Sequence, residues 1–234
     1  MAHQIFVLEQ ATRRKDEWLE YVDSMRSETK LCDLNPKHAS RRRRADPLEV
    51  IAPVEPHYDF QWTPYREPIV TPQVRQAFET AEITGLRFIP VRTQTTLGDP
   101  FYQELYEMPV TGWGGMAPVG SGIRIKEECP RCKWRVFTGY QNAARLFNLD
   151  DWDGSDLFLI WPLPRFAMAT GKAREVILAG RFTGVKLVPL TELQMKALTP
   201  GFTPGSVYNW FDEPRASELA EEVERVLQSA DYRS

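Results

Sequence analysis

The clearest alternation of apolar and polar positions lies in the second half of the chain. Residues 156–161 form an almost continuous apolar run, which is typical of a buried strand. Thr170 then stands where a helix N-cap is expected, and residues 172–179 carry apolar side chains at helical spacing. Gly184 favours a turn after that helix, and residues 185–190 predict a further strand.

The same pattern occurs earlier in the chain, because residues 62–91 align with residues 161–190 at a constant offset of 99 without a gap. The identical pairs are Trp62 and Trp161, Arg66 and Arg165, Thr71 and Thr170, Arg75 and Arg174, Thr84 and Thr183, Gly85 and Gly184, and Pro90 and Pro189. This match indicates an internal duplication. The alternative is a chance likeness between two segments with the same secondary-structure needs.

The pattern therefore predicts an α+β protein with two related strand–helix–strand units and a CxxC-bearing hairpin between them. Each unit is too small to bury its own apolar face, so we expect the two to pack together. Residues 1–56 are assigned to an N-terminal strand, a helix and a basic loop, and residues 57–110 to the first unit. Residues 111–155 are assigned to a glycine-rich turn and the hairpin, and residues 156–234 to the second unit with a C-terminal helix.

Four further segments have predicted conformations. Residues 4–9 read as a strand, and residues 13–26 as a helix with Trp18 on its apolar side. The run of residues 112–118, Gly-Trp-Gly-Gly-Met-Ala-Pro, reads as a flexible turn. Residues 207–211 read as a short aromatic strand before the last helix.

Composition narrows the class of protein. The chain has 234 residues, of which 42% are hydrophobic and 26% are charged, and its net charge of −3 implies no dedicated basic or acidic partner. No apolar run approaches the roughly 20 residues of a membrane span, and no signal peptide is recognisable, so we expect a cytoplasmic protein without a membrane partner. Three cysteines, an odd number, argue against a disulfide framework.

Cys129-Pro130-Arg131-Cys132 has the spacing of a zinc knuckle, in which two thiolates approach one tetrahedral ion. Cys32 is the expected third ligand, and His38 beside it would complete a set of four. Two other interpretations stay open. The motif is either an inert remnant of a knuckle, or a redox pair, although a redox pair favours a helix N-terminus rather than the predicted strand.

Other candidate chemistry is sparse. Four consecutive arginines at residues 41–44 suit a nucleic-acid surface, but no aromatic residues interleave with them, so a solvated loop is the simpler interpretation. The glycine run is not followed by the Lys-Ser/Thr of a phosphate loop. With only three scattered histidines and no Ser/His/Asp arrangement, we do not expect an enzyme.

The order of motifs resembles a known family. A Cys-Pro-x-Cys motif precedes a strand, an Asp-Leu-Phe segment and a Thr-capped helix that ends in Thr-Gly-Val-Lys-Leu-Val-Pro. Over residues 127–190 this order resembles the double-CXXCG family of myxobacterial paralogues and, more loosely, a wider family of immunity proteins of polymorphic toxin systems. The chain departs from the family pattern in having Lys133 after the second cysteine. It also lacks an N-terminal CxxCG, of which only Cys32 is left.

The resemblance implies an immunity protein that binds and neutralises a cognate toxin protein. The alternative is a zinc-knuckle regulator that binds nucleic acid, and an uncharacterised enzyme ranks third. Aromatic residues in loop-like segments are the candidate partner-binding residues, unless they serve ordinary core packing. They are Trp113, Tyr208, Trp210 and Phe211.

Overall fold

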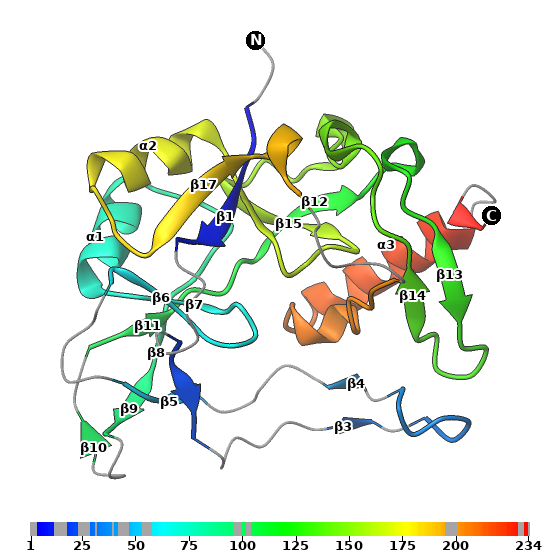
Figure 1. Cartoon of the computed structure of the whole chain (residues 1–234), viewed down its shortest axis with the longest axis horizontal. Coiled ribbons are helices and arrows are strands. Elements are labelled where there is room, and N and C mark those ends of the chain that lie inside the picture. The colour runs from blue at the N-terminus through cyan, green and yellow to red at the C-terminus, as the bar shows by residue number, and fades with distance from the viewer. Residues whose placement is uncertain are drawn as a thin grey trace.

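A computed structural model describes residues 4–11, 18–22, 29–30, 32–38, 40–41, 47–52, 58–95, 100–101, 104–194, 201–228 and 232–233. Over these residues the chain is a mixed α/β protein with several sheets and three α-helices (Figure 1). None of the described helices is long and apolar enough to span a bilayer.

The largest sheet has five strands in the order β12-β15-β16-β1-β17. β15 is parallel to β12, whereas the other neighbours are antiparallel. β15 is buried along its whole length, as its apolar sequence predicts. The strands are β1 (Phe6–Gln10), β12 (Gly112–Met116), β15 (Leu157–Trp161), β16 (Ala167–Ala169) and β17 (Val185–Pro189).

Two four-stranded sheets lie beside it. The first has the order β6-β7-β11-β8 and is antiparallel throughout. The second has the order β10-β9-β5-β2. The strands are β2 (Glu20–Tyr21), β5 (Glu49–Ile51), β6 (Phe60–Trp62), β7 (Pro68–Val70), β8 (Ile89–Pro90), β9 (Arg92–Gln94), β10 (Pro100–Phe101) and β11 (Tyr106–Glu107).

Two separate hairpins complete the strands. β3 (Thr29–Lys30) pairs with β4 (Ser40–Arg41), and β13 (Ile125–Glu128) pairs with β14 (Arg135–Phe137), in both cases antiparallel. Short 3₁₀ helices connect other elements of the described chain. They are η2 (Val119–Ser121), η3 (Ala143–Arg145), η4 (Leu149–Asp151), η5 (Leu190–Glu192) and η6 (Val207–Asn209).

The three α-helices bury one face each. α1 (Pro72–Thr80) and α2 (Gly171–Ala179) contact each other at one side of the molecule (Figure 1). Proline suits the first position of α1 because it lacks the N–H that would go unpaired there. α3 (Arg215–Gln228) buries residues at helical spacing, which the sequence also predicts. These residues are Ala216, Leu219, Val223 and Leu227.

From β7 and β16 onward, residues 62–91 and 161–190 have the same succession of elements, but the strands before them do not keep the predicted offset of 99. Phe60 pairs with Val70 as Leu157 pairs with Ala169, a difference of 97, so Trp62 and Trp161 are not equivalent. β7 and β16, and likewise α1 and α2, begin and end at residues that differ by the offset of 99. Gly85 and Gly184 both have φ of +79° and both touch backbone. A Cβ would lie 1.9 Å from the Leu157 carbonyl oxygen at residue 85 and 2.0 Å from that of Phe60 at residue 184, so only glycine fits.

Three predicted elements differ from the structure. Residues 112–116 are not a flexible turn but the buried strand β12, because Gly114 lets the backbone approach the Phe158 ring, where a Cβ would lie 2.5 Å away. Residues 207–209 form a 3₁₀ helix rather than a strand. Where the structure describes residues 13–26, Trp18 and β2 pair with other strands instead of continuing a helix. In the first and third cases tertiary pairing outweighs local propensity, whereas residues 207–209 form local hydrogen bonds and are capped by Ser206.

Candidate metal centre

Four side chains from two distant segments meet at one point. Cys32, His38, Cys129 and Cys132 each place a possible ligand atom within 4.8 Å of the others. Cys32 and Cys129 are buried, His38 is partly buried and Cys132 is exposed. All three cysteines are free thiols. The set therefore contains every cysteine of the chain.

The hairpin β13–β14 presents two of the ligands. Cys129 and Cys132 lie in the turn that joins these strands. The Lys133 N–H donates to the Cys129 carbonyl at 3.0 Å, and the Cys129 N–H donates to the Trp134 carbonyl at 2.8 Å. Lys133 has φ of +58°, in the left-handed region, which tightens the turn. The same turn thus brings both thiols to one side of the hairpin.

The other two ligands come from the connection between β3 and β4. Cys32 follows β3, and a turn closed by the His38 N–H and the Asn35 carbonyl, at 2.9 Å, returns His38 toward the same point. The chain separation between Cys32 and Cys129 is 97 residues. The site therefore joins the N-terminal part of the chain to its middle.

The distances suit a tetrahedral ion. The Sγ atoms of Cys32 and Cys129 are 3.8 Å apart, and the Sγ of Cys132 is 3.8 Å from Nδ1 of His38. Two thiolates bound tetrahedrally at the usual zinc–sulfur distance of about 2.3 Å are separated by roughly 3.8 Å. A disulfide would bring the sulfur atoms to about 2.0 Å. The spacing therefore matches shared coordination and not a covalent bond.

Neighbouring side chains orient His38. Its ring stacks on the indole of Trp134, with ring centres 4.3 Å apart and planes 6° from parallel. Its Nε2 lies 3.1 Å from the side-chain amide nitrogen of Asn35, whose Oδ1 accepts from the Lys37 N–H at 2.9 Å. These contacts leave Nδ1 facing Cys132. For Nδ1 to bind a metal ion, Nε2 must carry the ring proton, so the Asn35 amide would have to turn and present its oxygen, the kind of acceptor that usually fixes a ligating histidine.

The turn also favours ionisation of Cys129. The backbone N–H of Cys132 is the main cause that lowers the pKa of Cys129 to about 6; burial opposes this shift, and the Arg131 N–H and His38 add to it. Desolvation, with the neighbouring Cys32 and Cys129, raises the pKa of Cys132 to about 11, so without a metal ion the turn favours one thiolate rather than two. The thiolate is the form that binds metal ions.

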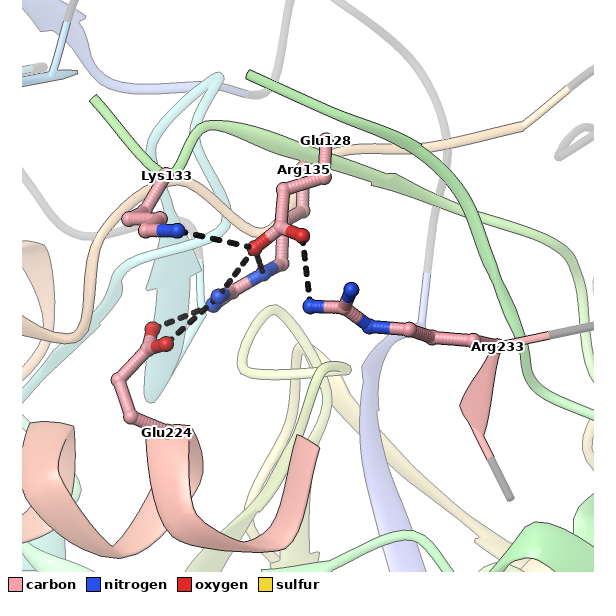
Figure 2. Close-up of polar contacts among 5 residues, drawn as sticks. All are labelled: Glu128, Lys133, Arg135, Glu224 and Arg233. Carbon is pink, nitrogen blue, oxygen red and sulfur yellow. Dashed lines mark hydrogen bonds and ion pairs between the residues drawn. The ribbon is translucent and has the colours of Figure 1, made fainter. Parts of the chain in front are cut away.

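A network of charged side chains anchors this hairpin to the rest of the molecule (Figure 2). Arg135 on β14 is only 9% exposed and lies 2.7 Å from Glu128 on β13 and 2.6 Å from Glu224 on α3. Arg233 reaches the second oxygen of Glu128 at 3.0 Å, and Lys133 approaches the first at 3.9 Å. Burial raises the pKa of Glu128, but the hydrogen bond and charge of Arg135 outweigh it, so the net shift is downward.

The predicted partner-binding aromatics fall into two groups. Trp113 and Phe211 are 2% and 3% exposed, and their rings pack edge to face with centres 5.7 Å apart. The indole N–H of Trp113 donates to Glu222 of α3 at 2.8 Å. Tyr208 and Trp210 are partly exposed. Only these last two are therefore reachable by a partner without rearrangement of the core.

The sequence identified the three cysteines and His38 but missed the residues that orient them. Asn35 and Trp134 hold the His38 ring, and Arg135 ties the hairpin to α3. A tryptophan two residues after the second cysteine was the available signal for ring stacking. Nothing local distinguishes Asn35 from an ordinary turn residue.

The described residues offer no second site of this kind. They contain one group of at least three metal-ligand side chains, and it is the centre just described. His38, the one histidine among them, belongs to that centre, and His3 and His57 lie outside the described residues. Residues 42–44 of the arginine run also lie outside them.

Comparison with known proteins assigns no family. No protein-family model matches the chain, and no curated protein matches it. The conclusions on function therefore rest on the side chains of this molecule and their arrangement.

Proposed function

We propose that Cys32, His38, Cys129 and Cys132 hold one zinc ion in a closed structural site, and that the protein acts by binding a cognate toxin as an immunity protein. The observation that carries the zinc proposal is the convergence of four donor atoms within 4.8 Å. Three thiols and one imidazole form a Cys₃His set, which is a common structural zinc site.

The donor set selects the metal. Soft thiolate ligands disfavour calcium and magnesium, which prefer oxygen. Four protein ligands fill the tetrahedral shell and leave no position for a substrate or a reactive water. The ion would therefore supply folding energy rather than chemistry.

The connections of the site explain what the ion would stabilise. It joins residues 32–38 to the hairpin β13–β14, and Arg135 joins that hairpin to α3. Zinc would thus tie residues 32–38 to the hairpin and, through Arg135, to α3, although these segments lie far apart in the sequence. A rigid scaffold of this kind suits an inhibitor, because preorganisation lowers the entropic cost of binding.

The immunity function is supported by three features. The chain resembles an immunity family over residues 127–190, the proposed metal site is closed, and the one described histidine is used as a ligand. Tyr208 and Trp210 are partly exposed next to α3, whose Glu218 and Glu221 are exposed. We place the toxin contact there, because aromatic anchors beside charged residues are typical of tight interfaces. A cytoplasmic location fits protection of the producing cell.

The zinc proposal is tested by elemental analysis together with thiol titration. Because all three cysteines lie in the site, thiol reactivity has no background from other positions. We expect about one zinc per chain and three slowly reacting thiols that become fast after chelation. His38→Ala should lose zinc and Lys37→Ala, at an exposed neighbouring position, should keep it. Metal-free wild-type protein with three fast thiols would contradict the proposal.

The immunity proposal is tested by co-expression with the product of the neighbouring upstream gene. We expect rescue of growth and a stable complex of the two proteins. Tyr208→Ala with Trp210→Ala should abolish both without loss of zinc, whereas Tyr65→Ala, which removes an exposed aromatic ring elsewhere, should change neither. An upstream product that is harmless alone, or toxicity that this protein leaves untouched, would overturn the proposal.

A further inference from the structure

We infer that the chain is two copies of one unit, that the copies exchange their first strands, and that each copy contributes one hairpin to the metal site. The part on the metal site rests on the zinc proposal above, and the part on strand exchange does not.

Two sheets have the same strand order. In one, β11 lies between β7 and β8, with β6 outside β7. In the other, β1 lies between β16 and β17, with β15 outside β16. β1 precedes β6 in the chain and β11 precedes β15. Each copy therefore begins with a strand that lies in the sheet of the other copy.

The exchanged strands also have the same register. Each exchanged strand begins with an aromatic residue that lies between two strands of the receiving sheet. The residues opposite it in one sheet differ by 99 from the residues opposite its counterpart in the other sheet. The pairs are Phe6 opposite Ala169 and Pro189, and Tyr106 opposite Val70 and Pro90. A register shift of one residue would turn every side chain to the other face, so the match is specific.

Hydrogen bonds at the ends of the exchanged strands agree with this correspondence. The Ala11 N–H donates to the Gly184 carbonyl at 3.1 Å, and the Thr111 N–H donates to the Gly85 carbonyl at 2.8 Å. Ala11 and Thr111 follow the equivalent strands β1 and β11 in the chain. The two glycines occupy the equivalent turns.

Contacts between the copies are reciprocal. The backbone N–H and hydroxyl of Thr84 donate to Oδ2 of Asp156, at 3.0 and 3.1 Å. The same two groups of Thr183 donate to Oδ2 of Asp59, both at 2.8 Å. Reciprocal contacts of this kind characterise the interface of a two-fold symmetric dimer. Similar secondary structure alone would not require each segment to cap the turn of the other.

The metal site follows the same correspondence. Cys32 follows β3 in the first copy, as Cys129 follows β13 in the second. Asn35 comes three residues after Cys32, as Cys132 comes three residues after Cys129. Asn35 thus occupies the position of a second thiol in its hairpin, and His38 supplies the fourth ligand instead. The site would be incomplete without either copy.

The correspondence is tested by moving the fourth ligand. His38→Ala should lose zinc, because it removes one of the four proposed ligands. Asn35→Cys in that background should restore one zinc per chain and protect four thiols. Lys37→Cys in the same background is the matched control and should restore neither. Equal recovery in the two double variants, or no recovery in the first, would overturn the inference.

The zinc content of the wild-type protein tests the zinc proposal separately from the correspondence of the two hairpins. A wild type without zinc, together with a zinc-binding Asn35→Cys/His38→Ala variant, would reject the proposed function and retain the correspondence of the hairpins. A wild type that binds zinc, together with an Asn35→Cys/His38→Ala variant that does not, would support the zinc proposal and reject the correspondence of the hairpins.

Strand exchange is tested without metal. A protease site inserted between Phe101 and Glu104 allows the full chain to be cut before β11 after folding, and it leaves the paired strands β9 and β10 on one fragment. With chelator present, we expect the two fragments to co-elute until denaturant is added, because each holds a strand in the other's sheet. Separation under native conditions would overturn the exchange.

Discussion

The sulfur atoms of Cys32 and Cys129 lie 3.8 Å apart although 97 residues separate them in the chain. That distance equals the edge of a tetrahedron of sulfur ligands around a zinc-sized ion, and it is too long for a disulfide bond. Both thiols come from hairpin turns, one in each half of the chain. On the proposal that these thiols share a zinc ion, the stability of the whole molecule should depend on that ion.

Removal of the metal is expected to destabilise the protein. Because binding free energy at a structural zinc site is also folding free energy, chelation should lower the melting temperature by at least about 6 °C. Cys129→Ser should melt at the lower temperature with or without chelator. Differential scanning calorimetry checks both, and a chelator-insensitive wild type would contradict the expectation.

Asn35→Ala should weaken zinc binding by about 10–100-fold, because loss of an outer partner leaves the His38 ring free to rotate. Competition with a chromophoric chelator measures the affinity. Asp33→Ala is the control, since Asp33 lies in the same connection but pairs with the exposed side chain of Arg131. An affinity for Asn35→Ala equal to that of the control would show that Asn35 does not orient the ligand.

Arg135→Met should lower the free energy of unfolding by about 2–3 kcal/mol, because it leaves Glu128 and Glu224 without their shared partner. Arg131→Met removes a salt bridge in which both side chains are about two-thirds exposed, so it should cost less than about 1 kcal/mol. Urea denaturation compares the two. Similar losses would mean that the network shown in Figure 2 does not anchor the hairpin.

Gly85→Ala and Gly184→Ala should each destabilise the protein by more than Gly154→Ala. All three residues have positive φ, but a Cβ at residue 154 would meet nothing within 4 Å. Gly154→Ala therefore measures the backbone strain alone, about 1 kcal/mol. The excess at Gly85 and Gly184 measures the close approach to the other unit's backbone. Equal thermal shifts at all three positions would remove that interpretation.

Acid should weaken the contact between Asp156 and Thr84. Burial raises the pKa of Asp156, but hydrogen bonds from the Thr84 N–H, Lys172, the Thr84 hydroxyl and Thr170 outweigh it, and the net shift is downward. The stabilisation is thus complete above the unfolded pKa of about 3.9 and is lost as pH falls through the lower folded pKa. The stability difference between wild type and Asp156→Asn should therefore be largest near neutral pH and shrink below about pH 4. Urea titrations across this range measure it, and a difference that does not change with pH would contradict the assignment.

Local sequence was sufficient where a segment makes its own contacts. The spacing of apolar residues predicted α1, α2 and α3, and the apolar run of residues 157–161 predicted β15. Of the two threonines predicted as N-caps, Thr170 accepts from the Ala173 N–H, whereas the Thr71 side chain makes no capping hydrogen bond. Glycine between a helix and a strand predicted the left-handed turns at Gly85 and Gly184. The helices and turns depend on hydrogen bonds and steric limits within a few residues, whereas β15 was predictable because its continuous apolar sequence requires burial.

Tertiary structure decided the rest. The glycine-rich residues 112–116 became a buried strand only because β15 supplies hydrogen-bond partners and the Phe158 ring fills the space beside Gly114. Trp113 and Phe211 were plausible surface anchors by sequence, but α3 covers the indole of one and the two rings pack together.

The metal centre combines both kinds of information. The sequence by itself specified the ligand types, because the Cys-x-x-Cys spacing fixes two thiols on one turn. It did not specify that Cys32 and His38 reach them, since contact between residues 97 positions apart depends on how the sheets arrange the two hairpins. Long-range pairing has no local signature, and for that reason only the folded chain brings the four ligands together.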